Sequence, residues 1–175
     1  MVAIPAKFDA ENIDKNMKFQ FHHVNSLINA TIASKPSDGR LKNLVFDKAI
    51  FTVNGSEIGS GDPAFNTVIH VSLSGIESNP VSIPYMEVGQ KIHTMSSTLR
   101  YTNPKTIEDL YEGVTGYGIP IFALPTTTDF ACDAKVELYS KDVLVCRLER
   151  GGNMAGLNLA GLNIINFTED HITYF

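Results

Sequence analysis

The sequence lacks the features that would mark a membrane, secreted or nucleic-acid-binding protein. No stretch approaches the ~20 apolar residues that span a bilayer, and the amino terminus has no basic region followed by an apolar leader. Lysines and arginines are scattered, and the formal net charge is -5, which argues against binding to a phosphate backbone. We therefore expect no membrane span, no nucleic-acid partner, and synthesis in the cytoplasm without a signal peptide.

Cysteine is scarce and tryptophan is absent, and both facts limit what the chain can do. The two cysteines, Cys132 and Cys146, fall on the apolar side of one predicted hairpin, too far apart along it to form a disulfide. We expect two buried free thiols, which agrees with a reducing place of synthesis. Without tryptophan, a platform for stacking sugars would have to use tyrosine, so a glycan partner is only an alternative expectation.

The sequence also lacks the local motifs of common catalytic and cofactor sites. It contains no G-x-S-x-G elbow, P-loop, G-x-G-x-x-G or H-E-x-x-H. His22 and His23 would point to opposite faces of a strand, so they predict no shared metal ion. We expect no enzyme, no cofactor and no metal. Glutamates on distant strands leave one alternative open, a glycoside-active enzyme with paired carboxylates. The available glutamates are Glu57, Glu77, Glu87, Glu137 and Glu149.

The clearest pattern that is present is a β-hairpin over residues 130–150. Apolar and polar residues alternate from Phe130 to Tyr139, and the alternation resumes after a loop of three residues, 140–142. Within that loop, Asp142 is the residue that tolerates a left-handed backbone. Matching the apolar sides of the strands predicts the register. The expected opposed pairs are Leu138 with Leu144, Val136 with Cys146, and Ala134 with Leu148.

Short strands are predicted along most of the remaining chain. Asn54-Gly55 follows one of them and predicts a tight hairpin turn. One short helix is predicted from Pro104 to Glu112, with Ile107, Leu110 and Tyr111 as its buried stripe. The further strands are expected at about 17–22, 24–34, 41–53, 67–73, 81–88, 91–101, 117–124 and 164–167.

This spacing of short strands predicts an all-β fold. The pattern has no βαβ rhythm, which favours an antiparallel β-sandwich of jelly-roll or Greek-key type, or a small barrel, with one short helix. Residues 1–16 are polar and aperiodic and are predicted to form an N-terminal arm. Residues 17–175 are predicted to form a single domain, a length that can bury a core of its own.

The remaining signal is a set of apolar residues near the two ends of the chain. Ile4 and Phe8 lie in the predicted arm, and Ile172, Tyr174 and Phe175 close the sequence. Apolar side chains in such positions are expected to pack against something. We predict that these five residues form an interface between copies of the chain.

The low charge, the many hydroxyl and amide side chains and the lack of a catalytic motif favour a protein that packs against copies or partners. In architecture, composition and size the chain resembles the small β-sandwich proteins of virus and bacteriophage particles. This resemblance implies a minor capsid, decoration or spike subunit that forms a homo-oligomer, contacts other assembly proteins and is located in a virion. It implies no site residue. The alternative is a carbohydrate- or ligand-binding module.

Overall fold

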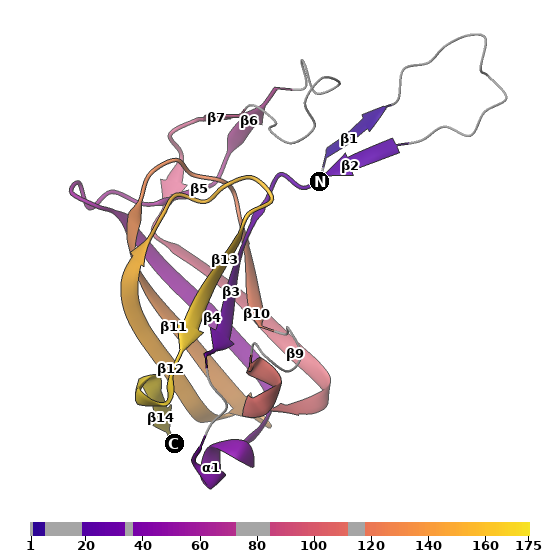
Figure 1. Ribbon diagram of the computed structural model, residues 1–175, viewed down its shortest axis with the longest axis vertical. Coiled ribbons are helices and arrows are strands. Elements are labelled where there is room, and N and C mark those ends of the chain that lie inside the picture. The colour runs from indigo at the N-terminus through magenta and orange to yellow at the C-terminus, as the bar shows by residue number, and fades with distance from the viewer. Residues whose placement is uncertain (1, 6–18, 34–36, 73–84, 112–117) are drawn as a thin grey trace, which may run out of the picture.

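The computed structural model is built almost entirely from β-strands (Figure 1). It describes residues 2–5, 19–33, 37–72, 85–111 and 118–175. A five-stranded sheet has the order β14-β12-β11-β4-β9, and a three-stranded sheet has the order β10-β3-β13. The bounds are β3 Ser26–Ile32, β4 Val45–Glu57, β9 Thr94–Thr106, β10 Ile119–Ala123, β11 Phe130–Ser140, β12 Val143–Met154, β13 Leu162–Phe167 and β14 Ile172–Tyr174. The prediction of an all-β fold is confirmed.

Smaller elements lie outside these two sheets. The ribbon formed by β1 and β2 projects at one end of the molecule, and β14 with the C-terminus lies at the opposite end (Figure 1). None of the helices in the described ranges is long and apolar enough to cross a membrane. The paired strands are β1 Val2–Pro5 with β2 Phe19–His22, β5 Phe65–Asn66 with β8 Lys91–Ile92, and β6 Ile69–Val71 with β7 Tyr85–Glu87. The helical turns are α1 Gly39–Lys42, η2 Ile107–Leu110 and η3 Glu169–His171.

Both main sheets contribute to one hydrophobic core. Alternate residues of each strand face inward, as a period of two requires, and each buried aromatic or branched side chain stabilises the fold by roughly 1.5–3 kcal/mol. The largest fully buried side chains include Phe46, Phe51, Phe130, Leu138 and Leu148 of the five-stranded sheet, and Ile28, Ile32, Ile119 and Phe167 of the three-stranded sheet.

The hairpin of β11 and β12 forms, but the predicted register is wrong by two residues. Val136 lies opposite Leu148, and Leu138 lies opposite Cys146. The turn has two residues, Lys141 and Asp142, both with positive φ, and the register then shifts between Leu138 and Tyr139. The turn and the irregularity together replace the predicted three-residue loop. Because the error before the shift is an even number of residues, Cys146 and Leu148 still face inward as expected. Leu144, beyond the shift, lies opposite Tyr139 instead, and Val145 packs against the core.

The hairpin turn predicted at Asn54-Gly55 does not form. Strand β4 begins at Val45, after α1, and continues through both residues to Glu57. The ring of Phe65 lies so close to Gly55 that a Cβ there would be 2.7 Å from it. Glycine is therefore needed at this position for a close approach and not for a turn.

The predicted helix from Pro104 to Glu112 is also wrong in type and start. Strand β9 continues through Pro104 to Thr106, and only a short 3₁₀ helix, η2, follows. The register between β4 and β9 shifts between Phe46 and Lys48, and β9 is an edge strand, so proline costs no ladder hydrogen bond there. Ile107 and Leu110 are buried, as predicted for the stripe.

Strand pairing departs from the antiparallel prediction at one place. Strand β13 runs parallel to β3, whereas the other pairings among the described strands are antiparallel. The parallel pair makes β3 the centre of the three-stranded sheet, with β10 on its other side.

Candidate interaction surface

The five residues predicted to form one interface lie in separate parts of the molecule. Ile4 is on β1, in the ribbon at one end, and Phe8 lies outside the described residues. Ile172 and Tyr174 are on β14 at the opposite end, and Phe175 follows them (Figure 1). One copy therefore does not present Ile4 and the C-terminal residues as a single surface. Their role in contacts between copies stays a prediction.

The C-terminal residues differ in how far their own chain covers them. Ile172 is half-buried against the core. The hydroxyl of Tyr174 donates a hydrogen bond of 3.4 Å to Asp38, and burial followed by the charge of Asp38 raises the pKa of Tyr174 to about 12. Phe175 is 63% exposed, with Arg147 5.1 Å from its ring. Phe175 is thus the residue of this group that offers free apolar area.

A second apolar surface lies on the solvent-facing side of the three-stranded sheet. Phe122 on β10 and Leu162 on β13 are both paired with Leu27 on β3, so the three side chains form a row across the sheet. Phe122 is 64% exposed and Leu162 is 60% exposed. The next row along the strands contains the paired residues Pro120, Asn29 and Ile164. We call these six residues the outer face.

The outer face is neutral, since none of its six residues is ionisable. A surface of this kind gains little from pairing with a charged partner and most from contact with another neutral, apolar surface. Exposed apolar patches on folded proteins mark interaction sites more often than single exposed residues do.

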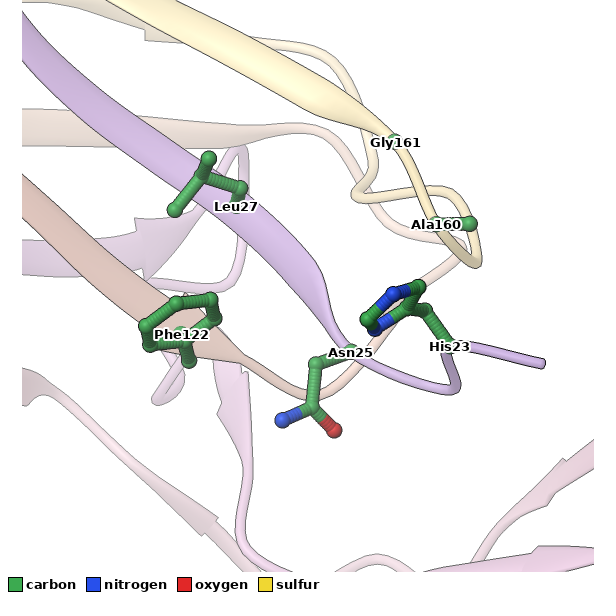
Figure 2. A pocket seen from close by; sticks show the side chains of 6 residues that line it. All are labelled: His23, Asn25, Leu27, Phe122, Ala160 and Gly161. Atoms are coloured by element: carbon green, nitrogen blue, oxygen red, sulfur yellow. The ribbon is translucent and has the colours of Figure 1, made fainter. Parts of the chain in front are cut away.

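A hollow of about 480 Å³ adjoins one end of the outer face. Figure 2 shows Phe122 and Leu27 on neighbouring strands, with His23 and Asn25 approaching from the segment before β3. Ala160 and Gly161 close the other side, from the loop before β13. The hollow combines an aromatic ring with an imidazole and an amide, the mixture found in small-ligand sites.

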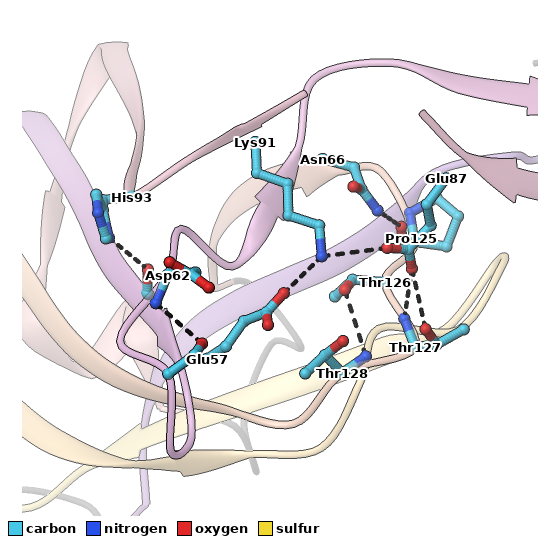
Figure 3. A network of polar contacts seen from close by, with 12 residues as sticks. Glu57, Asp62, Asn66, Glu87, Lys91, His93, Pro125, Thr126, Thr127 and Thr128 are labelled. Atoms are coloured by element: carbon cyan, nitrogen blue, oxygen red, sulfur yellow. Dashed lines mark hydrogen bonds and ion pairs between the residues drawn. The ribbon is translucent and has the colours of Figure 1, made fainter. Parts of the chain in front are cut away.

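A compact polar cluster lies around Lys91, where strands β4, β7 and β8 approach a loop (Figure 3). The Lys91 Nζ is 2.6 Å from Glu57 Oε1 and 3.2 Å from Glu87 Oε2, and these three side chains are 17%, 19% and 20% exposed. Thr127 donates its backbone N–H and its hydroxyl to Glu87 Oε1, at 2.8 and 3.2 Å. The lysine therefore links two shielded carboxylates on different elements.

Glu87 does not have the electrostatics of a glycosidase general acid. Burial alone would raise the pKa of Glu87, but hydrogen bonds from Thr127, Lys91 and Asn66 and the charge of Lys91 bring it below its usual value. A general acid in glycoside hydrolysis needs the opposite shift. Among the other glutamates considered, Glu137 pairs with Arg147 at 3.0 Å, Glu149 is exposed, and Glu77 lies outside the described residues.

Asn66 adds an unusual group to the Lys91 cluster. Its side chain is buried, and its Nδ2 donates a 2.7 Å hydrogen bond to the carbonyl of Pro125. Its Oδ1 is buried without a hydrogen-bond partner, the one such side-chain atom within the described ranges. A buried polar atom left unpaired costs about 1–3 kcal/mol and calls for an explanation.

The thiols are buried and free, as predicted. Cys146 is fully buried and Cys132 is 7% exposed. Burial raises the pKa of both thiols, that of Cys146 to about 12. Neither group is therefore an activated thiolate.

Two histidines, His93 and His171, serve local structure, and no group of three or more potential metal ligands occurs in the part of the chain that the structure describes. His171 accepts a hydrogen bond from the backbone of Thr168, and His93 lies 3.2 Å from both Ser56 Oγ and the Gly55 carbonyl.

Comparisons with protein-family models, curated proteins and solved structures found no match to this chain.

Neither the outer face nor the Lys91 cluster was predicted from the sequence. Strands were predicted at 117–124 and 164–167, but their pairing with β3 was not. Glu87 and Lys91 stand in different predicted strands, Asn66 lies outside the predicted strands, and the three residues match no motif.

Proposed function

We propose that the protein is a non-enzymatic assembly subunit that associates with copies of itself through the outer face. The observation that carries this proposal is the row of Phe122, Leu27 and Leu162, which spans three strands and is neutral throughout. Burying apolar area is the main favourable term in such association. Phe175 at the far end supplies a separate contact to a further neighbour.

The outer face is suited to a second copy because it is self-complementary. A two-fold axis that runs along β3 in the plane of the interface places Phe122 of each copy over Leu162 of the other. Such an isologous contact uses the same patch on both subunits. A stable dimer needs roughly 800 Å² from each partner, so the contact must extend beyond the six residues onto the neighbouring surface.

The architecture extends this proposal to a particle protein of a virus or bacteriophage, of minor capsid, decoration or spike type. Two sheets that share one core support a β-sandwich architecture, with jelly-roll or Greek-key order as the proposed type. Contact surfaces on different parts of one subunit allow it to join more than one neighbour, including other assembly proteins. The virion assignment rests on this analogy of architecture.

Light scattering coupled to size exclusion tests self-association. We expect the wild-type chain to have at least twice the mass of a single chain, and the double variant Phe122→Ser, Leu162→Ser to have the mass of one. Val143→Ser is the matched control, since Val143 is 64% exposed but lies on the other sheet. A monomeric wild type at high concentration, or a double variant that keeps the wild-type mass, would contradict the proposal.

The hollow beside Phe122 favours a second candidate, a carbohydrate- or ligand-binding module. Its volume of about 480 Å³ lies within the range of small-molecule sites. A glycan array separates the two functions. Reproducible binding that Asn25→Ala and Phe122→Ser both abolish, on a monomeric wild type, would favour the module over the assembly subunit.

A further inference from the structure

We propose that Lys91 and Asn66 become joined by an amide bond between their side chains, in a reaction assisted by Glu87. The geometry of these three residues points to an intramolecular modification site, independent of the function proposed above. The reactive groups are a primary amine, a carboxamide and a carboxylate.

The strand register brings the two groups together. Asn66 on β5 and Lys91 on β8 are direct partners in an antiparallel pair. Partners of this kind point their side chains to the same face, with Cβ atoms about 4.5–5.5 Å apart. Figure 3 shows the ends of the Lys91, Asn66 and Glu87 side chains pointing toward one another. The three groups are therefore held near one another by the backbone, which reduces the entropic cost of a reaction between them.

The state of the Asn66 amide is the second observation. Nδ2 is held by the Pro125 carbonyl, whereas Oδ1 is buried without a partner among the described residues. An amide becomes a better electrophile when a proton donor reaches its oxygen. The Asn66 amide donates a hydrogen bond to the Glu87 carboxylate, which also pairs with Lys91, so Glu87 lies beside both reacting groups and can pass a proton taken from Lys91 to the amide.

The reaction balances without an added reagent. Lys91 transfers one proton to the Glu87 carboxylate and becomes a neutral amine, whose lone pair attacks Cγ of Asn66. Attack gives a tetrahedral intermediate, and Glu87 passes its proton to Oδ1. Glu87 then carries a second proton from Nζ to Nδ2. The Cγ–Nδ2 bond breaks, the carbonyl re-forms as the Oδ1 proton returns to Glu87, and that proton leaves with the ammonia as ammonium. The product is an Nζ–Cγ amide, and no group is oxidised or reduced.

The surroundings shield the reaction but also slow it. Phe65 precedes Asn66, and its ring packs edge-on against Phe130 at 5.3 Å, so the cluster borders the core. Glu57 competes with Glu87 for the Lys91 ammonium and keeps it charged. Its hydrogen bond is the largest cause of a raised pKa for Lys91. Replacing Glu57 should therefore speed the reaction.

Mass spectrometry of the full chain tests the amide bond. We expect purified wild-type protein to be lighter than its sequence by one ammonia. Trypsin cannot cleave after a modified lysine, so residues 49–100 should appear as one peptide in place of 49–91 and 92–100. Lys91→Arg and Glu87→Gln should have full mass, since a guanidinium is a poor nucleophile and an amide carries no proton between groups. Glu57→Gln is the matched control and should still lose ammonia, at least as fast as wild type.

Asn54-Gly55 provides a separate route to ammonia loss, by closure of a succinimide on the backbone. That product leaves Lys91 cleavable by trypsin and persists in Lys91→Arg. The proposal is overturned if folded wild-type protein, verified by circular dichroism, keeps its full mass after prolonged incubation. It is equally overturned if trypsin still cleaves after Lys91 in wild-type protein that has lost ammonia, so that residues 49–91 and 92–100 appear as separate peptides.

Discussion

Gly55 illustrates how the contacts of one residue decide its role. In sequence it forms half of the strongest hairpin signal in the chain, whereas in the structure it lies within β4, opposite Cys132. The atoms nearest to the site of its Cβ belong to the side chains of Ala64 and Phe65, in the segment that follows the next turn. Glycine can be required either for close packing or for a turn, and the sequence alone does not distinguish the two causes.

We expect Gly55→Ala to destabilise the protein by about 1–3 kcal/mol, because the added Cβ would meet the rigid ring of Phe65. Gly152→Ala is the matched control. Gly152 also lies opposite Cys132, on β12, and nothing lies within 4 Å of the site of its Cβ. Its free energy of unfolding should change by about 0.5 kcal/mol or less. Urea unfolding of the two variants gives the comparison, and equal losses would contradict the role assigned to Phe65.

The buried Cys146 thiol predicts a dependence of stability on alkaline pH. Burial raises its pKa from 9.0 to about 12, while the unfolded chain titrates at the ordinary value. Between these pH values the unfolded state binds fewer protons than the native state, so the free energy of unfolding falls as pH rises. The contribution is complete below about pH 9 and is lost by about pH 12.

Urea unfolding at a series of alkaline pH values measures this effect. The free energy of unfolding of the wild type should fall by up to about 1.4 kcal/mol more per pH unit than that of Cys146→Ala. The slope is the quantity to compare, since the alanine variant already starts from a lower free energy of unfolding at neutral pH. Identical slopes would show that the thiol titrates alike in the native and unfolded states.

At the scale of elements, the sequence predicted the sidedness of strands better than their ends and partners. The inward positions of β11 follow from alternation alone and are confirmed, as are Cys146 and Leu148 of β12, whereas Leu144 is displaced by the irregularity. The register was wrong because a two-residue turn and an irregularity leave the alternation almost unchanged. Pro104 suggested a helix start, but whether an edge strand tolerates it depends on a neighbour that is distant in sequence.

The turn of this hairpin gives a prediction of its own. Lys141 has φ of 49°, a conformation that costs an ordinary side chain roughly 1 kcal/mol and that asparagine accepts more readily. We expect Lys141→Asn to raise the free energy of unfolding by about 0.5 kcal/mol. Its backbone N–H still donates to Asp47. Lys135→Asn, in the middle of β11, should lower stability instead, and urea unfolding of both variants tests the sign.

At the scale of the whole molecule, the outer face and the C-terminal residues are separate surfaces, and only the second was predicted. The terminal residues were visible because they stand together in the sequence. The outer face was not, because its rows combine three strands that the sequence spaces far apart. The Lys91 cluster was missed for the same reason, since its members meet only through the pairing of β5 with β8 and the approach of β7.

The neutrality of the outer face predicts how assembly responds to salt. If the six uncharged residues drive association, the mass in solution should hold or increase when ionic strength rises from about 0.05 to 0.5 M, since screening acts on charges. Light scattering at the two salt concentrations measures this. A fall to the monomer mass at high salt would show that charged residues elsewhere form the contact.

The parallel pairing of β13 with β3 also governs the order in which the molecule can be completed during synthesis. Strand β3 is made early, but its two neighbours, β10 and β13, emerge only in the last third of the chain. Until then the apolar underside of β3 has no sheet to join. Folding of the smaller sheet is therefore dominated by slow, non-local closure.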